Sequence, residues 1–257
     1  MKNNARKEYR KTAVKQVTHL NPSYFVLETE TVEIIPAAGQ FYLIKPVTGF
    51  SSLLHIPLSI YDVVEFRLRF FCKTIGKGTQ ELAALRSGDE IFLLGPLGTG
   101  FTLPENCKTL LVSGGIGYAP LFMLKKQLIA RNNQVLWLHG GQSTQDIFPA
   151  DIIYTDDGSS GEKGFVTEGM RRILNNPACP DFTEIYSCGP KKMMKTVSSF
   201  ADEKRIPLQV SLEEYMACGL GTCLGCVVKM RNNEEEFYGR VCKDGPVFQA
   251  KEVIWNE

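Results

Sequence analysis

Four cysteines near the end of the chain stand at a spacing that suits an inorganic cluster. The pattern C-x4-C-x2-C-x15-C is formed by Cys218, Cys223, Cys226 and Cys242. Short gaps let three thiolates wrap one side of a small metal core, and a later strand returns the fourth. Plant-type [2Fe-2S] proteins share the C-x4-C-x2-C opening, whereas structural zinc sites more often carry two C-x2-C pairs. A [2Fe-2S] cluster is therefore the favoured interpretation, with zinc as the alternative.

A glycine-rich turn in the middle of the chain suits a phosphate. Gly114, Gly115 and Gly117 lie in SGGIGYAP, between the apolar run TLLVS and a segment with helical spacing of leucines. Such a turn presents backbone amides and a helix dipole to a pyrophosphate. Because Gly-Gly-x-Gly alone is a weak motif, a plain tight turn is the alternative.

A second glycine signal occurs in IGKGTQEL at 75–82. Here Gly78 precedes Thr79, which could cap a short helix predicted from Thr79 to Leu85 and leave its amides free for phosphate oxygens. A capped turn at the edge of a sheet explains the segment equally well.

Electron counting links these signals. A nicotinamide gives or takes a hydride, which carries two electrons, whereas an iron-sulfur cluster passes electrons singly. A flavin is the common cofactor that does both, so a chain with the other two sites is expected to hold one.

Three segments of different character could position these sites. Residues 1–104 show short strands with alternating or continuous apolar runs, which predict an antiparallel β-barrel. Strands alternate with helices over residues 105–208, which predicts a parallel α/β domain. Residues 209–257 form a small β-rich module with the cysteines. The fold class is therefore α+β and multidomain, and the barrel is left to hold the flavin.

The composition of the chain indicates which classes of partner and which cellular compartment to expect. The chain has 257 residues, 44% of them hydrophobic and 22% charged, with a formal net charge of +1. Near-neutrality gives no argument for nucleic acid or an anionic membrane, and no apolar run is long enough to span a bilayer. With no secretory signal in sight, the clustered cysteines favour metal binding in a reducing cytoplasm.

The motifs together resemble the ferredoxin reductase superfamily, and within it the electron-transfer subunits of type 1B dihydroorotate dehydrogenases. Taken singly most are weak, but their order and spacing along nearly the whole chain are specific. They are GQF at 39–41, PLSI at 57–60, GKGT at 76–79, GPLGTGF at 95–101, GGIGYAP at 114–120, TDDGSSGEKGFVT at 155–167, CGP at 188–190 and CGLGTCLGC at 218–226.

Beside the cluster, the resemblance implies a site for FAD and a site for NAD. FAD would be held in the barrel by Ile56, Pro57, Leu58, Ser59, Phe71, Cys72, Lys73, Gly78 and Thr79. The three glycines of 114–117 would lie near the pyrophosphate of NAD, and Cys188 would act where the nicotinamide meets the flavin. Asp156 and Asp157 favour NAD over NADP, because carboxylates repel a phosphate and accept hydrogen bonds from ribose hydroxyls.

Three positions depart from the family pattern. Ile56, preceded by His55, stands where an arginine usually pairs with the FAD pyrophosphate, and Gln142 and Tyr215 also replace expected arginines. A neutral side chain offers no bidentate donor, so weaker FAD binding is expected unless His55 substitutes in part.

The function implied by the resemblance is electron transfer in pyrimidine biosynthesis. An FMN-containing dihydroorotate dehydrogenase catalytic subunit would oxidise dihydroorotate, and its electrons would pass through the cluster and FAD to NAD+. The partners would form a heterotetramer with two copies of each chain. Alternatives are a ferredoxin-NAD(P) oxidoreductase or sulfide dehydrogenase subunit of the same superfamily, and a zinc-binding adaptor that has lost flavin.

Overall fold

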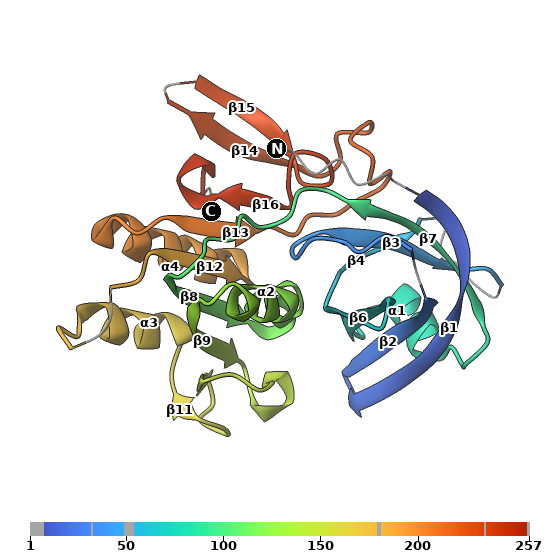
Figure 1. Cartoon of the computed structure of the whole chain (residues 1–257), viewed down its shortest axis with the longest axis horizontal. Helices are drawn as coiled ribbons and strands as arrows, with labels where there is room; N and C mark the ends of the chain where they lie inside the picture. Colours follow the sequence, from blue (N-terminus) through green and yellow to red (C-terminus); the bar gives the residue numbers. More distant parts are fainter. Residues whose placement is uncertain (1–7, 32, 49–53, 179–180, 234, 256–257) are drawn as a thin grey trace.

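The computed structural model describes residues 8–31, 33–48, 54–178, 181–233 and 235–255. Within these ranges the strands form two seven-stranded sheets and a two-stranded hairpin (Figure 1). Residues 1–7, which belong to the predicted barrel, lie outside the described part of the chain.

The first sheet is antiparallel, which confirms the prediction for the N-terminal segment. Its strand order is β4-β3-β7-β1-β2-β6-β5, and β1 bends around one side of the molecule in Figure 1. The strands are β1 (Glu8–Asn21), β2 (Tyr24–Thr31), β3 (Phe41–Pro46), β4 (Ile56–Ser59), β5 (Asp62–Val64), β6 (Arg67–Lys73) and β7 (Glu90–Leu97). One short helix, α1 (Lys77–Ala83), follows β6.

Strand β6 shows how alternation builds the core of this sheet. Leu68 and Phe70 are fully buried, while Arg67 and Arg69 on the other face are half-exposed. The alternating sequence FRLRFF begins at Phe66, but that residue has a left-handed φ of 63° and is 57% exposed. Phe66 therefore belongs to the turn and not to the core.

The second sheet confirms the predicted α/β segment. Its order is β11-β10-β9-β8-β12-β13-β16, with parallel pairing except between β13 and β16. Strand β8 is buried along almost its whole length, as expected for a parallel strand covered on both faces. The strands are β8 (Lys108–Gly114), β9 (Gln134–Gly141), β10 (Ile152–Thr155), β11 (Glu162–Lys163), β12 (Glu184–Cys188), β13 (Leu208–Ser211) and β16 (Val247–Gln249).

Three helices accompany this sheet: α2 (Tyr118–Ala130), α3 (Val166–Asn175) and α4 (Lys191–Lys204). Short 3-10 turns occur at Gly115–Gly117, Thr144–Asp146 and Ala250–Glu252. Among the described residues, none of the helices combines the length and apolar character needed to cross a membrane.

The C-terminal segment is joined to the second sheet. The segment 218–226, which we call the cysteine loop, carries Cys218, Cys223 and Cys226. It precedes a hairpin of β14 (Val227–Asn232) and β15 (Glu235–Arg240), which projects from the molecule in Figure 1. Cys242 follows the hairpin. The chain then returns as β16, which pairs antiparallel with β13. The predicted limit between residues 208 and 209 falls inside β13, so the cysteine module and the α/β domain share one sheet.

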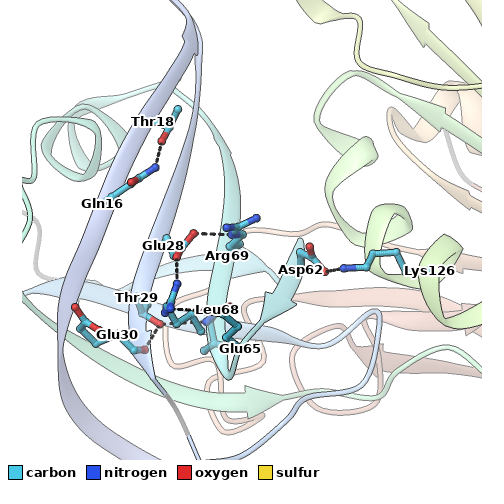
Figure 2. A network of polar contacts seen from close by, with 11 residues as sticks. Gln16, Thr18, Glu28, Thr29, Glu30, Asp62, Glu65, Leu68, Arg69 and Lys126 are labelled. Carbon is cyan, nitrogen blue, oxygen red and sulfur yellow. Dashed lines mark hydrogen bonds and ion pairs between the residues drawn. The ribbon is translucent and has the colours of Figure 1, made fainter.

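Charged and aromatic side chains connect the two large sheets. Figure 2 shows Lys126 of α2 reaching Asp62 of β5, at 2.6 Å between Nζ and Oδ1. Nearby on the first sheet, the buried Glu28 carboxylate accepts from Arg67 and Arg69. Aromatic contacts continue the interface, with ring centroids 4.3 Å apart for Tyr61–Phe122 and 4.6 Å apart for Phe71–Phe148.

Candidate cofactor and nucleotide sites

A cavity of about 720 Å³ lies along the carboxyl ends of the parallel strands. Ligands of open α/β sheets bind at this edge, so the cavity is the candidate dinucleotide site. Lys73 from the first sheet also lines it, which brings the cavity up to the predicted flavin segment. Residues that follow the strands supply much of its wall, among them Gly114, Gly115, Gly141, Asp156, Gly189 and Glu213.

Two of the three predicted glycines line the cavity and the third supports it. Gly114 and Gly115 face the cavity, and Gly115 has a left-handed φ of 52°. Gly117 instead contacts the end of β12, where an added Cβ would lie 2.2 Å from the Cys188 carbonyl oxygen. The absence of a side chain at this position lets the start of α2 approach β12 closely.

The two predicted aspartates have different environments. Asp156 lines the cavity, and burial together with the neighbouring Asp157 and Asp146 raises its pKa. Asp157 is exposed, and hydrogen bonds from the Ser159 side chain and from the Ser159 amide, the latter at 2.8 Å, lower its pKa. Of the two predicted aspartates, Asp156 is the one that lines the cavity.

Cys188 ends β12 and is 1% exposed. Burial raises the pKa of its thiol well above the ordinary value, and the nearby Glu213 raises it further. The thiol is therefore neutral at physiological pH, so it offers a compact side chain at the end of the strand and no thiolate nucleophile.

One carboxylate joins the cavity to the first sheet. Asp146 Oδ1 accepts hydrogen bonds from Tyr24 Oη at 2.6 Å and from Lys73 Nζ at 2.9 Å. Tyr24 and Lys73 come from β2 and β6, whereas Asp146 follows β9 in the second sheet. These bonds hold the predicted flavin strand against the wall of the cavity.

A buried chain of hydrogen bonds positions Asp146. Trp137 Nε1 donates to Ser113 Oγ at 2.8 Å, and Ser113 Oγ lies 2.8 Å from His139 Nδ1. His139 Nε2 lies 2.9 Å from the Asp146 carbonyl oxygen, which can only accept. In the neutral ring Nε2 therefore carries the proton and Nδ1 accepts from the serine hydroxyl.

This chain predicts sensitivity to acid. Burial lowers the pKa of His139 from 6.5 to about 4. Between these values the unfolded chain binds a proton that the folded protein excludes, so stability should fall as the pH drops from 6.5 towards 4, by up to roughly 3 kcal/mol. Urea unfolding of the protein and of His139→Gln across this range measures the effect. The variant should lose less stability, and identical pH profiles would contradict the prediction.

The predicted flavin segments come from three elements. Residues Ile56 to Ser59 form β4 and are all half-buried, and β4 contacts β6. In β6, Phe71 and Cys72 are buried while Lys73 is half-exposed. Gly78 and Thr79 lie in α1, which contacts β2.

Thr79 does not cap α1 as predicted. The helix begins at Lys77 with Gly76 as its N-cap, so Thr79 is the third helical residue. Its hydroxyl oxygen accepts from the amides of Ile75 at 3.0 Å and Gly76 at 3.2 Å. Thr79 therefore lies one turn into the helix and not at its cap. From there its hydroxyl group holds the loop in front of the helix.

His55, which precedes Ile56 at the position where the family has an arginine, has a polar atom available for a ligand. His55 Nε2 is buried and has no hydrogen-bond partner among the described residues. Burial and Lys45 lower the pKa of His55, so its ring is neutral near pH 7. An orphaned ring nitrogen beside β4 fits a polar ligand, but the neutral ring supplies none of the charge that an arginine would bring to a pyrophosphate.

The four C-terminal cysteines lie as two pairs. Cys218 Sγ accepts from the Cys223 amide and Cys226 Sγ from the Cys242 amide, both at 3.4 Å. In the described part of the chain, no group of three or more His, Cys, Asp or Glu side chains is arranged around one metal ion position. A two-iron cluster needs two thiolates on each iron, and each of these pairs would supply two.

Of the four cysteines, Cys218 has surroundings that favour a thiolate. Amides of Leu220 and Cys223 lower the pKa of Cys218 to about 6. Burial and the adjacent Cys226 raise the pKa of Cys242 to about 12. A positively charged iron core would relieve the repulsion between these sulfurs, so the residues fit an iron-sulfur cluster.

The cysteine loop also contacts the first sheet. Gly219 has a left-handed φ of 65°, and a Cβ there would lie 2.4 Å from Leu43 Cδ1 in β3. Cys226 and Cys242 are buried, whereas Cys223 is exposed. One side of the loop therefore faces the first sheet and the other faces solvent.

Comparisons of sequence point to one family. Residues 213–254 match the model of the iron-sulfur cluster binding domain of dihydroorotate dehydrogenase B. The dihydroorotate dehydrogenase B (NAD(+)) electron transfer subunit of Clostridium perfringens is 38% identical over 256 residues, covering 96% of this chain and 98% of the relative. The corresponding subunit of Listeria monocytogenes is 40% identical, covering 84% of this chain and 86% of the relative.

Solved structures agree on the fold. The NADH-dependent reduced ferredoxin-NADP oxidoreductase matches with a TM-score of 0.82 and 29% identity, covering 95% of this chain and 90% of that chain. A ferredoxin NADP+ reductase from Neisseria gonorrhoeae, with bound FAD and NADP, matches with a TM-score of 0.64 and 18% identity, covering 76% and 91%.

Several residues of the candidate sites were not predicted from the sequence. His139 and Glu213 are polar residues at or just after the carboxyl ends of predicted parallel strands, a position that could have drawn attention to them. Tyr24 and Asp146 lie 122 positions apart. No local pattern could have paired these two.

Proposed function

This chain belongs to the family of dihydroorotate dehydrogenase B electron transfer subunits, and on that premise we propose that it passes electrons through a [2Fe-2S] cluster and FAD to NAD+. A subunit of this kind serves a catalytic partner. The proposed partner is an FMN-containing dihydroorotate dehydrogenase, with two copies of each chain in a cytoplasmic heterotetramer.

The observation that carries the proposal is the position of the first sheet. Lys73 at one end of this sheet lines the nucleotide cavity, and Leu43 in β3 packs under the cysteine loop. The predicted flavin segments therefore lie in the body that contacts both other sites. That order matches the electron relay, because a flavin must exchange electrons with the cluster and with the nicotinamide.

Each set of residues then has a task. We assign Gly114 and Gly115 to the pyrophosphate of NAD, and Asp156 to the hydroxyls of its adenosine ribose. The segments 56–59, 71–73 and 78–79 would hold FAD, whose chemistry is to convert between hydride and single-electron transfer. The four cysteines would hold the cluster, two on each iron.

Exposed apolar side chains beside the cluster loop fit a partner surface. Leu220 is 43% exposed, Leu224 60% and Tyr215 94%, and the exposed Cys223 belongs to the same loop. Apolar and aromatic side chains of this kind form the cores of protein interfaces. A catalytic subunit docked here would bring its own cofactor close to the iron.

The absorption spectrum of protein purified without oxygen tests the proposal. Flavin bands with broad cluster absorption are expected, and NADH should bleach them faster than NADPH because Asp156 repels the additional phosphate. A colourless protein that contains zinc would contradict the flavin and the cluster together. Reduction of the co-purified complex by dihydroorotate tests the partner, and its absence would favour a ferredoxin or sulfide substrate.

Replacing Ile56 with arginine should strengthen FAD binding. A guanidinium at this position restores a bidentate, charge-assisted contact with the pyrophosphate, so the dissociation constant should fall about 10- to 100-fold. Fluorescence titration of the flavin-free protein with FAD measures it. Ile56→Gln is the matched control, because it adds a polar group without charge. Equal affinities of the two variants would contradict the assignment of this strand to the pyrophosphate.

A further inference from the structure

Glu213 is a carboxyl group for which the electron relay has no assigned use. It comes two residues after β13 and lines the nucleotide cavity. Among the described residues no hydrogen bond or ion pair holds its carboxyl group, and its side chain interacts electrostatically with Cys188. Glu213 is exposed as a residue, and desolvation by the surrounding protein atoms raises the pKa of its carboxyl group.

The strand order places Glu213 at the nicotinamide end of the cavity. Strand β8 and its glycines stand in the middle of the edge, with β10 two positions to one side and β13 two positions to the other. At about 4.8 Å between strands, Asp156 and Glu213 are separated by roughly 19 Å along the edge. With the pyrophosphate at the glycines and the adenosine ribose at Asp156, the other nucleoside extends towards Glu213.

Two of the three lysines that line the cavity are already paired. Lys73 is held by Asp146 at 2.9 Å, and Lys191 is held by Glu214. The third lysine, Lys192, takes part in no ion pair among the described residues. Glu213 likewise has no ion-pair partner there, and desolvation is the one cause of its raised pKa. A carboxylate that lines a cavity and has no ion-pair partner is stabilised by a cation that enters the cavity.

We propose that Glu213 is the counter-charge of the oxidised nicotinamide ring and makes this cavity selective for NAD+ over NADH. The inference rests on the proposed function and deepens it. The ring of NAD+ is positively charged, and when it takes up a hydride, which is one proton with two electrons, that charge disappears. The carboxylate therefore attracts the substrate and not the product, which favours release of NADH after each transfer.

Binding measurements on the FAD-loaded protein test the role of Glu213. The two probes are NAD+ and tetrahydro-NAD, whose ring is neutral and cannot give up a hydride. In isothermal titration, Glu213→Gln should weaken NAD+ binding about 10- to 100-fold and change tetrahydro-NAD binding by less than about threefold. Asp156→Asn is the control, because it acts on the adenosine half that both probes share and should leave the ratio of their affinities unchanged.

The outcomes of the binding measurements distinguish failure of the Glu213 inference from failure of the proposed function. If Glu213→Gln leaves the ratio of the two affinities as in the parent protein, the inference is overturned, whether or not both bind more weakly. If the parent protein binds neither probe, the proposed function fails first. If Glu213→Gln loses FAD, Glu213→Asp replaces it in the experiment, because aspartate keeps the charge but is shorter by one methylene. This variant must show a measurably smaller preference for NAD+ over tetrahydro-NAD. An unchanged preference also overturns the inference.

Discussion

Replacing Cys242 with serine should remove the iron-sulfur cluster and leave the flavin site intact. Cys242 lies beside Cys226, and the serine hydroxyl is a poorer ligand for iron than a thiolate. Iron and acid-labile sulfide per chain should fall at least about tenfold. NADH should still reduce the bound FAD, because the nucleotide cavity is lined by other parts of the chain. Electron transfer between FAD and the catalytic partner should be lost.

Cys107→Ser is the matched control for this experiment. Cys107 is a half-buried free cysteine just before β8, and its thiol donates to the Glu105 carbonyl oxygen. A serine can make the same hydrogen bond, so iron, sulfide and flavin should all stay at the level of the parent protein. Unchanged iron and sulfide in Cys242→Ser would contradict the assignment of the fourth ligand.

Replacing Gly117 with alanine should damage both the fold and the nicotinamide site. The new Cβ would lie 2.2 Å from the carbonyl oxygen of Cys188 and 2.6 Å from the amide nitrogen of Gly189. Both are backbone atoms, so α2 and β12 must separate. We expect a loss of about 3 kcal/mol in the free energy of unfolding. Because hydride transfer needs close alignment, reduction of FAD by NADH should slow on the order of 100-fold.

Thermal unfolding and stopped-flow reduction by NADH measure the two effects. For stability, Gly76→Ala is the control, since Gly76 has an extended φ of −170° and a Cβ there meets no atom within 4 Å. Gly117 itself has a φ of −59°, which alanine adopts easily, so any loss reports the close contact and not backbone strain. A Gly117→Ala protein as stable as Gly76→Ala would show that α2 and β12 can move apart without cost.

The order of elements could be predicted because each carries a local signal. Strand β8 is a continuous apolar run before glycines, as a parallel strand covered on both faces must be. Strand β6 alternates because one face is solvated. In the cysteine loop the ligands are close in sequence, so their spacing alone reveals them. These features depend on neighbours along the chain and need no knowledge of the tertiary structure.

The remaining features depend on contacts between distant residues. The need for glycine at 117 arises from the carbonyl oxygen of Cys188, which the sequence places 71 positions away. Lys73 and Asp146 form their ion pair only after the two sheets meet. Strand β16 has three residues, too few for a pattern, and its pairing with β13 comes from the fold. Thr79 missed its predicted role because Gly76, with no side chain, became the cap.

The pairing of β16 with β13 bears on how such chains can be recombined. A cluster module whose strands paired only with one another could be transferred to another reductase as an independent domain. Here the polypeptide runs from the first three cysteines through β14 and β15 to Cys242, and β16 then completes an edge of the nucleotide-binding sheet. A chimera joined just after β13 would separate β13 from β16 and leave both without their pairing partner. A viable exchange must therefore transfer β13 together with the cysteine segment and β16.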